Sequence, residues 1–75
     1  MYKYCIIKGI YVNDENVKYV SYGVVLFKKH PGKFVGIKIA QDIFLNYTKA
    51  KQFIKTCNKL KLHPIHFENV IEDFL

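Results

Sequence analysis

The apolar residues follow the two-residue period of β-strands as far as Ile43 and a helical period after it. Runs rich in Tyr, Ile, Val and Phe cover residues 2–12, 17–28 and 34–43. The polar residues 13–16 separate the first two runs, and His30-Pro31-Gly32 separates the second from the third. Proline presets φ and glycine accepts a positive φ, so both segments favour turns. The pattern predicts an antiparallel meander of three strands.

Two helices are predicted after the strands. Asn46 or Thr48 can cap the first helix, and Pro64 suits the first turn of the second. The first helix has an apolar face made by Ala50, Phe53, Ile54, Cys57 and Leu60. The second has one made by Phe67, Val70, Ile71, Phe74 and Leu75. We therefore predict a single α+β domain over 1–75, of order β-β-β-α-α, with both helices packed on one face of the sheet.

Strand pairing decides which face the helices cover. We expect Val12 to pair with Val17 and His30 to pair with Lys33. The covered face then carries Cys5, Ile7, Tyr11, Val20, Tyr22, Val24, Leu26, Val35, Ile37, Ile39 and Ile43. A slip of one residue would exchange the two faces.

The opposite face is also rich in apolar side chains, although a solvated face should alternate to polar residues. Two short helices cannot cover both sides of the sheet, and a large exposed apolar patch normally marks an interaction site. The second strand is apolar on both faces in any register. The sheet therefore keeps uncovered apolar side chains even if the predicted pairing is wrong. The residues predicted to form a partner or dimer face are Tyr2, Tyr4, Ile6, Ile10, Tyr19, Val25, Phe27 and Phe34.

Composition adds a second, open question. The chain of 75 residues carries 12 lysines, no arginine and a net charge of +6. Two explanations of the high lysine content are open: codon usage in an A/T-rich genome, or a basic surface selected to bind nucleic acid. The absence of arginine weakens the second explanation, because arginine makes the bidentate phosphate contacts that lysine cannot. The candidate nucleic-acid contacts, next to sheet aromatics that could stack bases, are Lys8, Lys38, Lys51, Lys55 and Lys59.

Catalytic, metal and cofactor sites are not expected. His63 and His66 lack the paired cysteines of a zinc site, and Cys57 sits among the apolar residues of a helix. A domain of this size has little room for both a core and a small-molecule pocket. No apolar run is long enough to span a membrane, so we expect a cytoplasmic protein with reduced Cys5 and Cys57.

Several short motifs resemble a group of small bacterial proteins of unknown function. They are Tyr22-Gly23, Asp42-Ile43, Cys57-Asn58, and the stretch from Leu62 through Pro64 and His66 to Leu75. The resemblance implies a low-G/C Gram-positive or phage-type source and transfers no activity or site residue. We therefore predict a small interaction or regulatory module, a homodimer or bound to a partner protein. The alternative is a single-stranded nucleic-acid-binding protein; a phage or plasmid protein that inhibits a host machine would show the same pattern.

Overall fold

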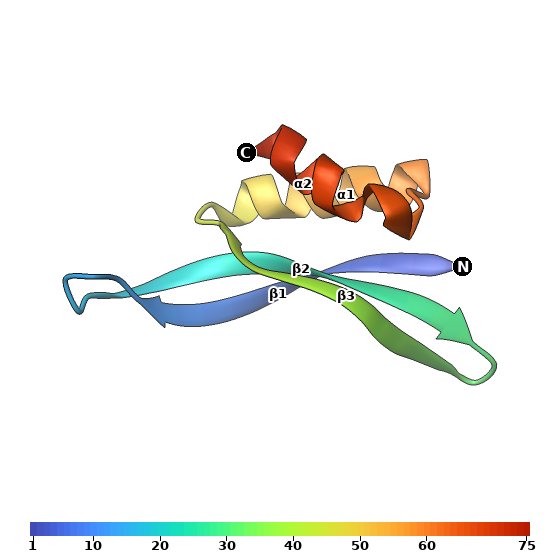
Figure 1. The fold of residues 1–75 in the computed structure, drawn as a ribbon, viewed down its shortest axis with the longest axis horizontal. Coiled ribbons are helices and arrows are strands. Elements are labelled where there is room, and N and C mark those ends of the chain that lie inside the picture. The colour runs from blue at the N-terminus through green and yellow to red at the C-terminus, as the bar shows by residue number, and fades with distance from the viewer.

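The computed structural model describes all of residues 1–75. The elements are β1 (Tyr2–Val12), β2 (Lys18–His30), β3 (Lys33–Phe44), α1 (Tyr47–Leu60), a short 3₁₀ helix η1 (Pro64–His66) and α2 (Phe67–Phe74). The strands form one antiparallel sheet in the order β1-β2-β3. Both helices lie on the same side of this sheet, which extends past them at both ends (Figure 1). The predicted α+β architecture is confirmed. Neither helix has the length and apolar character needed to cross a bilayer.

The first hairpin corrects the predicted register. Val12 pairs with Lys18, not with Val17. Asn13 causes the difference: its side-chain Oδ1 accepts the backbone N–H groups of Glu15 (2.9 Å) and Val17 (3.0 Å). Asn16 then takes a left-handed φ of 63°, and residues 13–17 form a five-residue loop in place of the predicted four-residue one. As a result, even positions of β1 share a face with even positions of β2.

The second hairpin begins as predicted, with His30 paired to Lys33, but β3 then slips twice against β2. One shift lies where the β2 register passes from Phe27 to Leu26, so that Val25 faces Ile39. The other lies beside Gly23, where the pairing jumps from Ala40 to Phe44. A Cβ on Gly23 would lie 2.3 Å from the carbonyl oxygen of Ala40, so the bulged backbone of β3 passes directly over this glycine. Only a residue without a side chain fits there.

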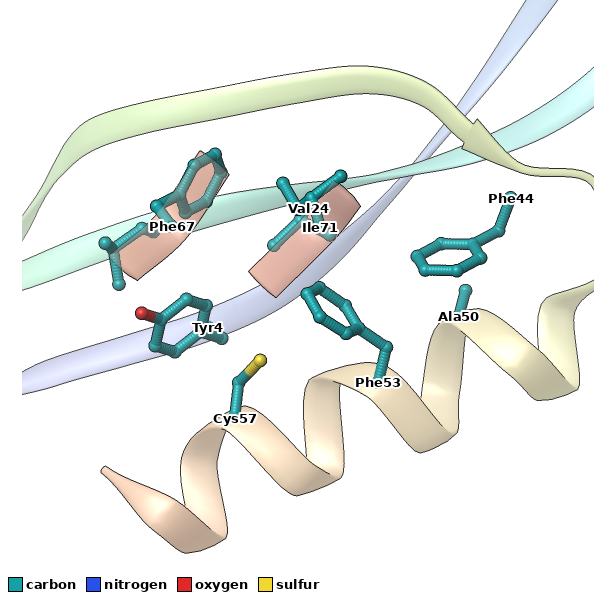
Figure 2. Packing of buried hydrophobic residues seen from close by; sticks show 9 residues of the cluster. Tyr4, Val24, Phe44, Ala50, Phe53, Cys57, Phe67 and Ile71 are labelled. Atoms are coloured by element: carbon teal, nitrogen blue, oxygen red, sulfur yellow. The ribbon is translucent and has the colours of Figure 1, made fainter. Parts of the chain in front are cut away.

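The hydrophobic core lies between the sheet and the two helices. Phe53 of α1 is 1% exposed, and its ring lies 5.4 Å from Phe44 at the end of β3 and 4.7 Å from Phe74 of α2. Tyr4 stacks on Phe67 at 6.3 Å. Figure 2 shows the side chains of the core cluster, which come from the three strands, α1 and α2. The buried residues of this core cluster are Tyr4, Val24, Leu26, Phe44, Ala50, Phe53, Cys57, Phe67 and Ile71.

The helix ends follow local side-chain chemistry. Asn46 caps α1 by accepting the N–H of Lys49 at 3.1 Å, as one of the two predicted caps. Lys61 ends the helix with a left-handed φ of 51°. His63 accepts the N–H of Ile65 and so caps η1. Leu60, which the helical spacing assigned to the buried face, is 61% exposed, because it lies in the last turn before the chain leaves α1.

Asn58 protects the outer edge of β1. Its Nδ2 donates to the carbonyl oxygen of Tyr4 at 2.9 Å, and its Oδ1 accepts the N–H of Tyr4 at 2.8 Å. The side-chain amide therefore takes the place of a neighbouring strand, which shields this stretch of edge from pairing with another chain. The Tyr4 hydroxyl in turn donates to the carbonyl oxygen of Leu62 at 3.0 Å. These contacts fix α1 against β1.

Candidate interaction surface

The sheet face that the helices leave uncovered carries a continuous set of apolar side chains. Val25 of β2 stands between Cys5 of β1 and Ile39 of β3. Phe27 lies beside it, since a Cβ on Gly36 would touch both Phe27 (3.6 Å) and Val25 (3.9 Å). We call this set the open face; its members are Cys5, Ile7, Val25, Phe27, Phe34 and Ile39. No element of the chain covers it (Figure 1).

The side chains on this face differ in how far they reach into solvent. Ile39 is 58% exposed and Phe34 is 46% exposed. Cys5, Val25 and Phe27 are half-buried by one another. The face is therefore a flat apolar layer in the centre of the sheet with two more prominent side chains on β3.

Few charges accompany the open face. Lys3 belongs to it, with its Nζ 6.0 Å from the centre of the Phe34 ring, and Lys29 shares its side by strand alternation. Lys8 pairs with Tyr22 and therefore belongs to the helix side. Lys38 is also on the helix side, where its Nζ lies 3.0 Å from Glu68 Oε1 and 6.0 Å from the Phe67 ring. That ion pair and hydrogen bond lower the pKa of Glu68.

Half of the residues predicted for the partner face lie on the uncovered side of the sheet. Tyr19, Val25, Phe27 and Phe34 do lie on the side away from the helices. Tyr2, Tyr4 and Ile6 instead face the helices, and Tyr4 is only 3% exposed. Ile10 is 70% exposed but also lies on the helix side, on the part of the first hairpin that extends beyond the helices. The shifted register of the first hairpin is the reason, because one residue exchanges the two faces of β1.

The same shifts change the predicted covered face. Cys5, Ile7 and Tyr11 turn to the open side through the first hairpin, and Ile39 follows through the β3 slip. Val20 and Val35 keep to the helix side but remain 40% and 37% exposed, because no helix reaches them. Ile37 occupies the irregular step of β3 and is 41% exposed. Two of the expected residues, Val24 and Leu26, belong to the core, and Tyr22 and Ile43 pack against it.

A shallow cleft of about 550 Å³ lies beside the bulge of β3. Asp42 has a left-handed φ of 57° there and accepts a 2.7 Å hydrogen bond from the Tyr19 hydroxyl. Hydrogen bonds from Tyr19 and Ser21 lower the pKa of Asp42, and the same carboxylate raises the pKa of Tyr19. The cleft has one carboxylate and no histidine, cysteine or lysine; its lining is Asn13, Tyr19, Ser21, Asp42, Ile43 and Leu45. Its two titratable side chains, Tyr19 and Asp42, are hydrogen-bonded to each other, and their pKa values are shifted in opposite directions away from neutral, which does not suit general acid–base catalysis. No residue pattern in the sequence predicted this cleft, because the bulge of β3 creates it.

No group of three or more histidine, cysteine or acidic side chains is close enough to hold a metal ion. Lys51, Lys55 and Lys59 are exposed on α1, on the far side of the molecule from the open face. The predicted nucleic-acid contacts therefore do not share a surface with the aromatic side chains of the open face.

Comparison with known proteins identifies a family and nothing more specific. The model of a family described as "Family of unknown function (DUF6514)" matches residues 1–75. No curated protein matches the chain. No solved structure matches it either.

Proposed function

Because the chain belongs to DUF6514, a family of unknown function, we propose a function from its surface: it is a small, non-enzymatic interaction module that forms a homodimer through the open face. The observation that carries the proposal is the uncovered apolar layer centred on Val25, with Ile39 and Phe34 projecting from it. Interface centres are apolar and poor in charge, as this layer is.

The surface area supports a partner of similar size. The chain exposes 5618 Å², whereas a compact monomer of 8.9 kDa would expose about 4,800 Å². The excess of about 800 Å² equals what one partner buries in a standard interface. The radius of gyration agrees: it is 13.2 Å, against about 11 Å for a compact chain of this length. Covering the open face would bring the molecule back to ordinary compactness.

A second copy suits this face better than a charged partner. The layer is apolar, and two-fold homodimers, in which the same patch of both copies meets, are the commonest oligomers. Two sheets packed face to face lie about 10 Å apart. The lysines of α1 would then be on the two outer sides, so the charges of these helices would be well separated. Screening at physiological salt reduces the remaining repulsion.

The alternative is single-strand binding by base stacking on the sheet. It requires lysines next to the aromatic side chains of the open face. Phe27 and Phe34 have only Lys3 and Lys29 near them, and the surrounding positions are aliphatic. Aliphatic side chains offer bases no stacking surface. The geometry therefore favours the homodimer. We further propose that the module acts in a bacterial or phage-infected cytosol, with both thiols reduced.

The homodimer can be tested with one substitution on each side of the sheet. We expect the wild-type chain to sediment at about twice 8.9 kDa at micromolar concentration. Ile39→Glu should raise the dimer Kd at least about 100-fold, because each copy would bury an unpaired carboxylate. Ile39 is 58% exposed, so the monomer should keep its fold.

Ile10→Glu is the matched control, since Ile10 is 70% exposed on the helix side. It introduces the same charge and should leave the sedimenting mass unchanged. Circular dichroism should report wild-type folds for both variants. A wild-type chain that remains monomeric at 100 µM, or a control that dissociates as readily as Ile39→Glu, would contradict the proposal.

Cys5 provides an independent reporter at the centre of the open face. Thiol alkylation of Cys5 should slow as the protein concentration passes through the dimer Kd, because the dimer covers this side chain. Cys57 is the internal control: it is fully buried, and burial raises the pKa of its thiol to about 11, so it should react only after unfolding. Mass spectrometry of the alkylated peptides separates the two. A Cys5 rate that is independent of concentration would count against a dimer through this face.

A further inference from the structure

The outer surface of α1 is basic and has no partner in the fold. Lys49, Lys51, Lys55 and Lys59 lie on the helix, Lys61 ends it, and all five are exposed. The helix has no acidic residue. The single ion pair of the structure joins Lys38 to Glu68 and involves none of these five lysines.

Part of this charge arrangement disfavours the helix, although Lys59 in the last turn suits the negative end of the helix dipole. Lys49 and Lys51 stand in the first turns, where the helix dipole is positive and an acidic residue is preferred. Lys51, Lys55 and Lys59 repeat at i and i+4, and each such like-charged pair costs a few tenths of a kcal/mol. The core does not need lysine at these positions, since the buried residues of α1 are Ala50, Phe53 and Cys57. A bound anion would offset both the repulsion between these lysines and their unfavourable interaction with the helix dipole.

We infer that this outer surface of α1 binds the phosphate backbone of nucleic acid without reading its sequence. Lys51 and Lys59 are eight residues apart, which spans about 12 Å along the axis and suits a linear polyanion. Thr48, Gln52 and Thr56 lie between the lysines and can donate to phosphate oxygens. The lack of arginine removes the bidentate contact to guanine, so the contacts are electrostatic.

A membrane surface fits this helix less well. Helices that lie on membranes insert an apolar face, and α1 uses its apolar face for the core. The α1 surface also lies away from the open face (Figure 1). The inference is therefore independent of the homodimer.

The test measures binding of a fluorescent 20-base-pair duplex and a 20-nucleotide single strand between 50 and 300 mM salt. If about five phosphates are neutralised, log K should fall with log salt with a slope near −4.5 for the duplex and near −3.5 for the single strand. Lys51→Gln/Lys55→Gln/Lys59→Gln should reduce the duplex slope by about 2.7.

The control variant is Lys8→Gln/Lys18→Gln/Lys33→Gln, which removes the same net charge from the strands and leaves α1 intact. The slope of this control variant should be shallower than the wild-type slope by less than about 1. Ile39→Glu should still bind with nearly the wild-type slope, which separates this inference from the homodimer. No binding to either probe at 50 mM salt would overturn the inference, and so would equal losses in the two triple variants. Binding to anionic vesicles but to neither nucleic acid would reassign the surface to a membrane.

Discussion

Replacing Gly23 by alanine should destabilise the domain by about 3 kcal/mol, the upper end of the cost of forcing an extra group into a packed site. The new Cβ would lie 2.3 Å from the carbonyl oxygen of Ala40 and 3.0 Å from the Cα of Gln41. Both atoms are backbone, so no side-chain rotation relieves the contact. A domain this small has a total stability of about 3–5 kcal/mol from its core. Urea unfolding at fixed protein concentration should show a midpoint close to zero denaturant.

Gly36→Ala is the matched control for Gly23→Ala. Its Cβ would meet the Phe27 ring at 3.6 Å and the Val25 side chain at 3.9 Å, both ordinary contacts. The change should be neutral or add up to about 1 kcal/mol, because alanine has fewer unfolded conformations. Equal stability of the two alanine variants would mean that β3 does not pass over Gly23 in solution.

Phe53→Ala should leave the chain largely unfolded at 25 °C. Burial at 1% exposure and contacts with Phe44 and Phe74 make this ring the link between the sheet and both helices. Truncating a buried phenylalanine costs about 3–5 kcal/mol, which is the whole stability expected here. Loss of the far-UV helical signal and of a cooperative thermal transition is the expected result.

Phe74→Ala serves as the comparison because it removes the same atoms from a ring that is 48% exposed. The expected loss is less than half that of Phe53→Ala, since less surface is transferred from water. A cooperative transition in Phe53→Ala at wild-type temperature would contradict the packing described for the core.

The candidate surface was only partly predictable from the amino-acid sequence. An excess of apolar side chains beyond what two helices can cover follows from β2 alone, because Val24 and Leu26 on one side and Val25 and Phe27 on the other are all apolar. Which residues of β1 and β3 join each side depends on the pairing. Tyr4 was expected on the partner face and is instead in the core.

Two local details account for the difference. The Asn13 side chain holds a five-residue loop, which hydrophobic periodicity does not distinguish from a four-residue one. The bulge of β3 at Ile37, opposite the step from Phe27 to Leu26, moves Ile39 to the open face. Asn58 could have been noticed only as a polar residue near an apolar helix face; its bonds to the Tyr4 backbone require the helix to lie against the edge of β1.

The order of elements and the surplus of apolar surface were determined by the sequence itself, since each depends on residues that are near neighbours along the chain. Strand register, the assignment of side chains to the two faces and the separation of the α1 lysines from the sheet aromatics were decided by tertiary structure. The physical reason is that side chains alternate across a strand, so a single residue gained in a loop or bulge moves every later side chain to the other side.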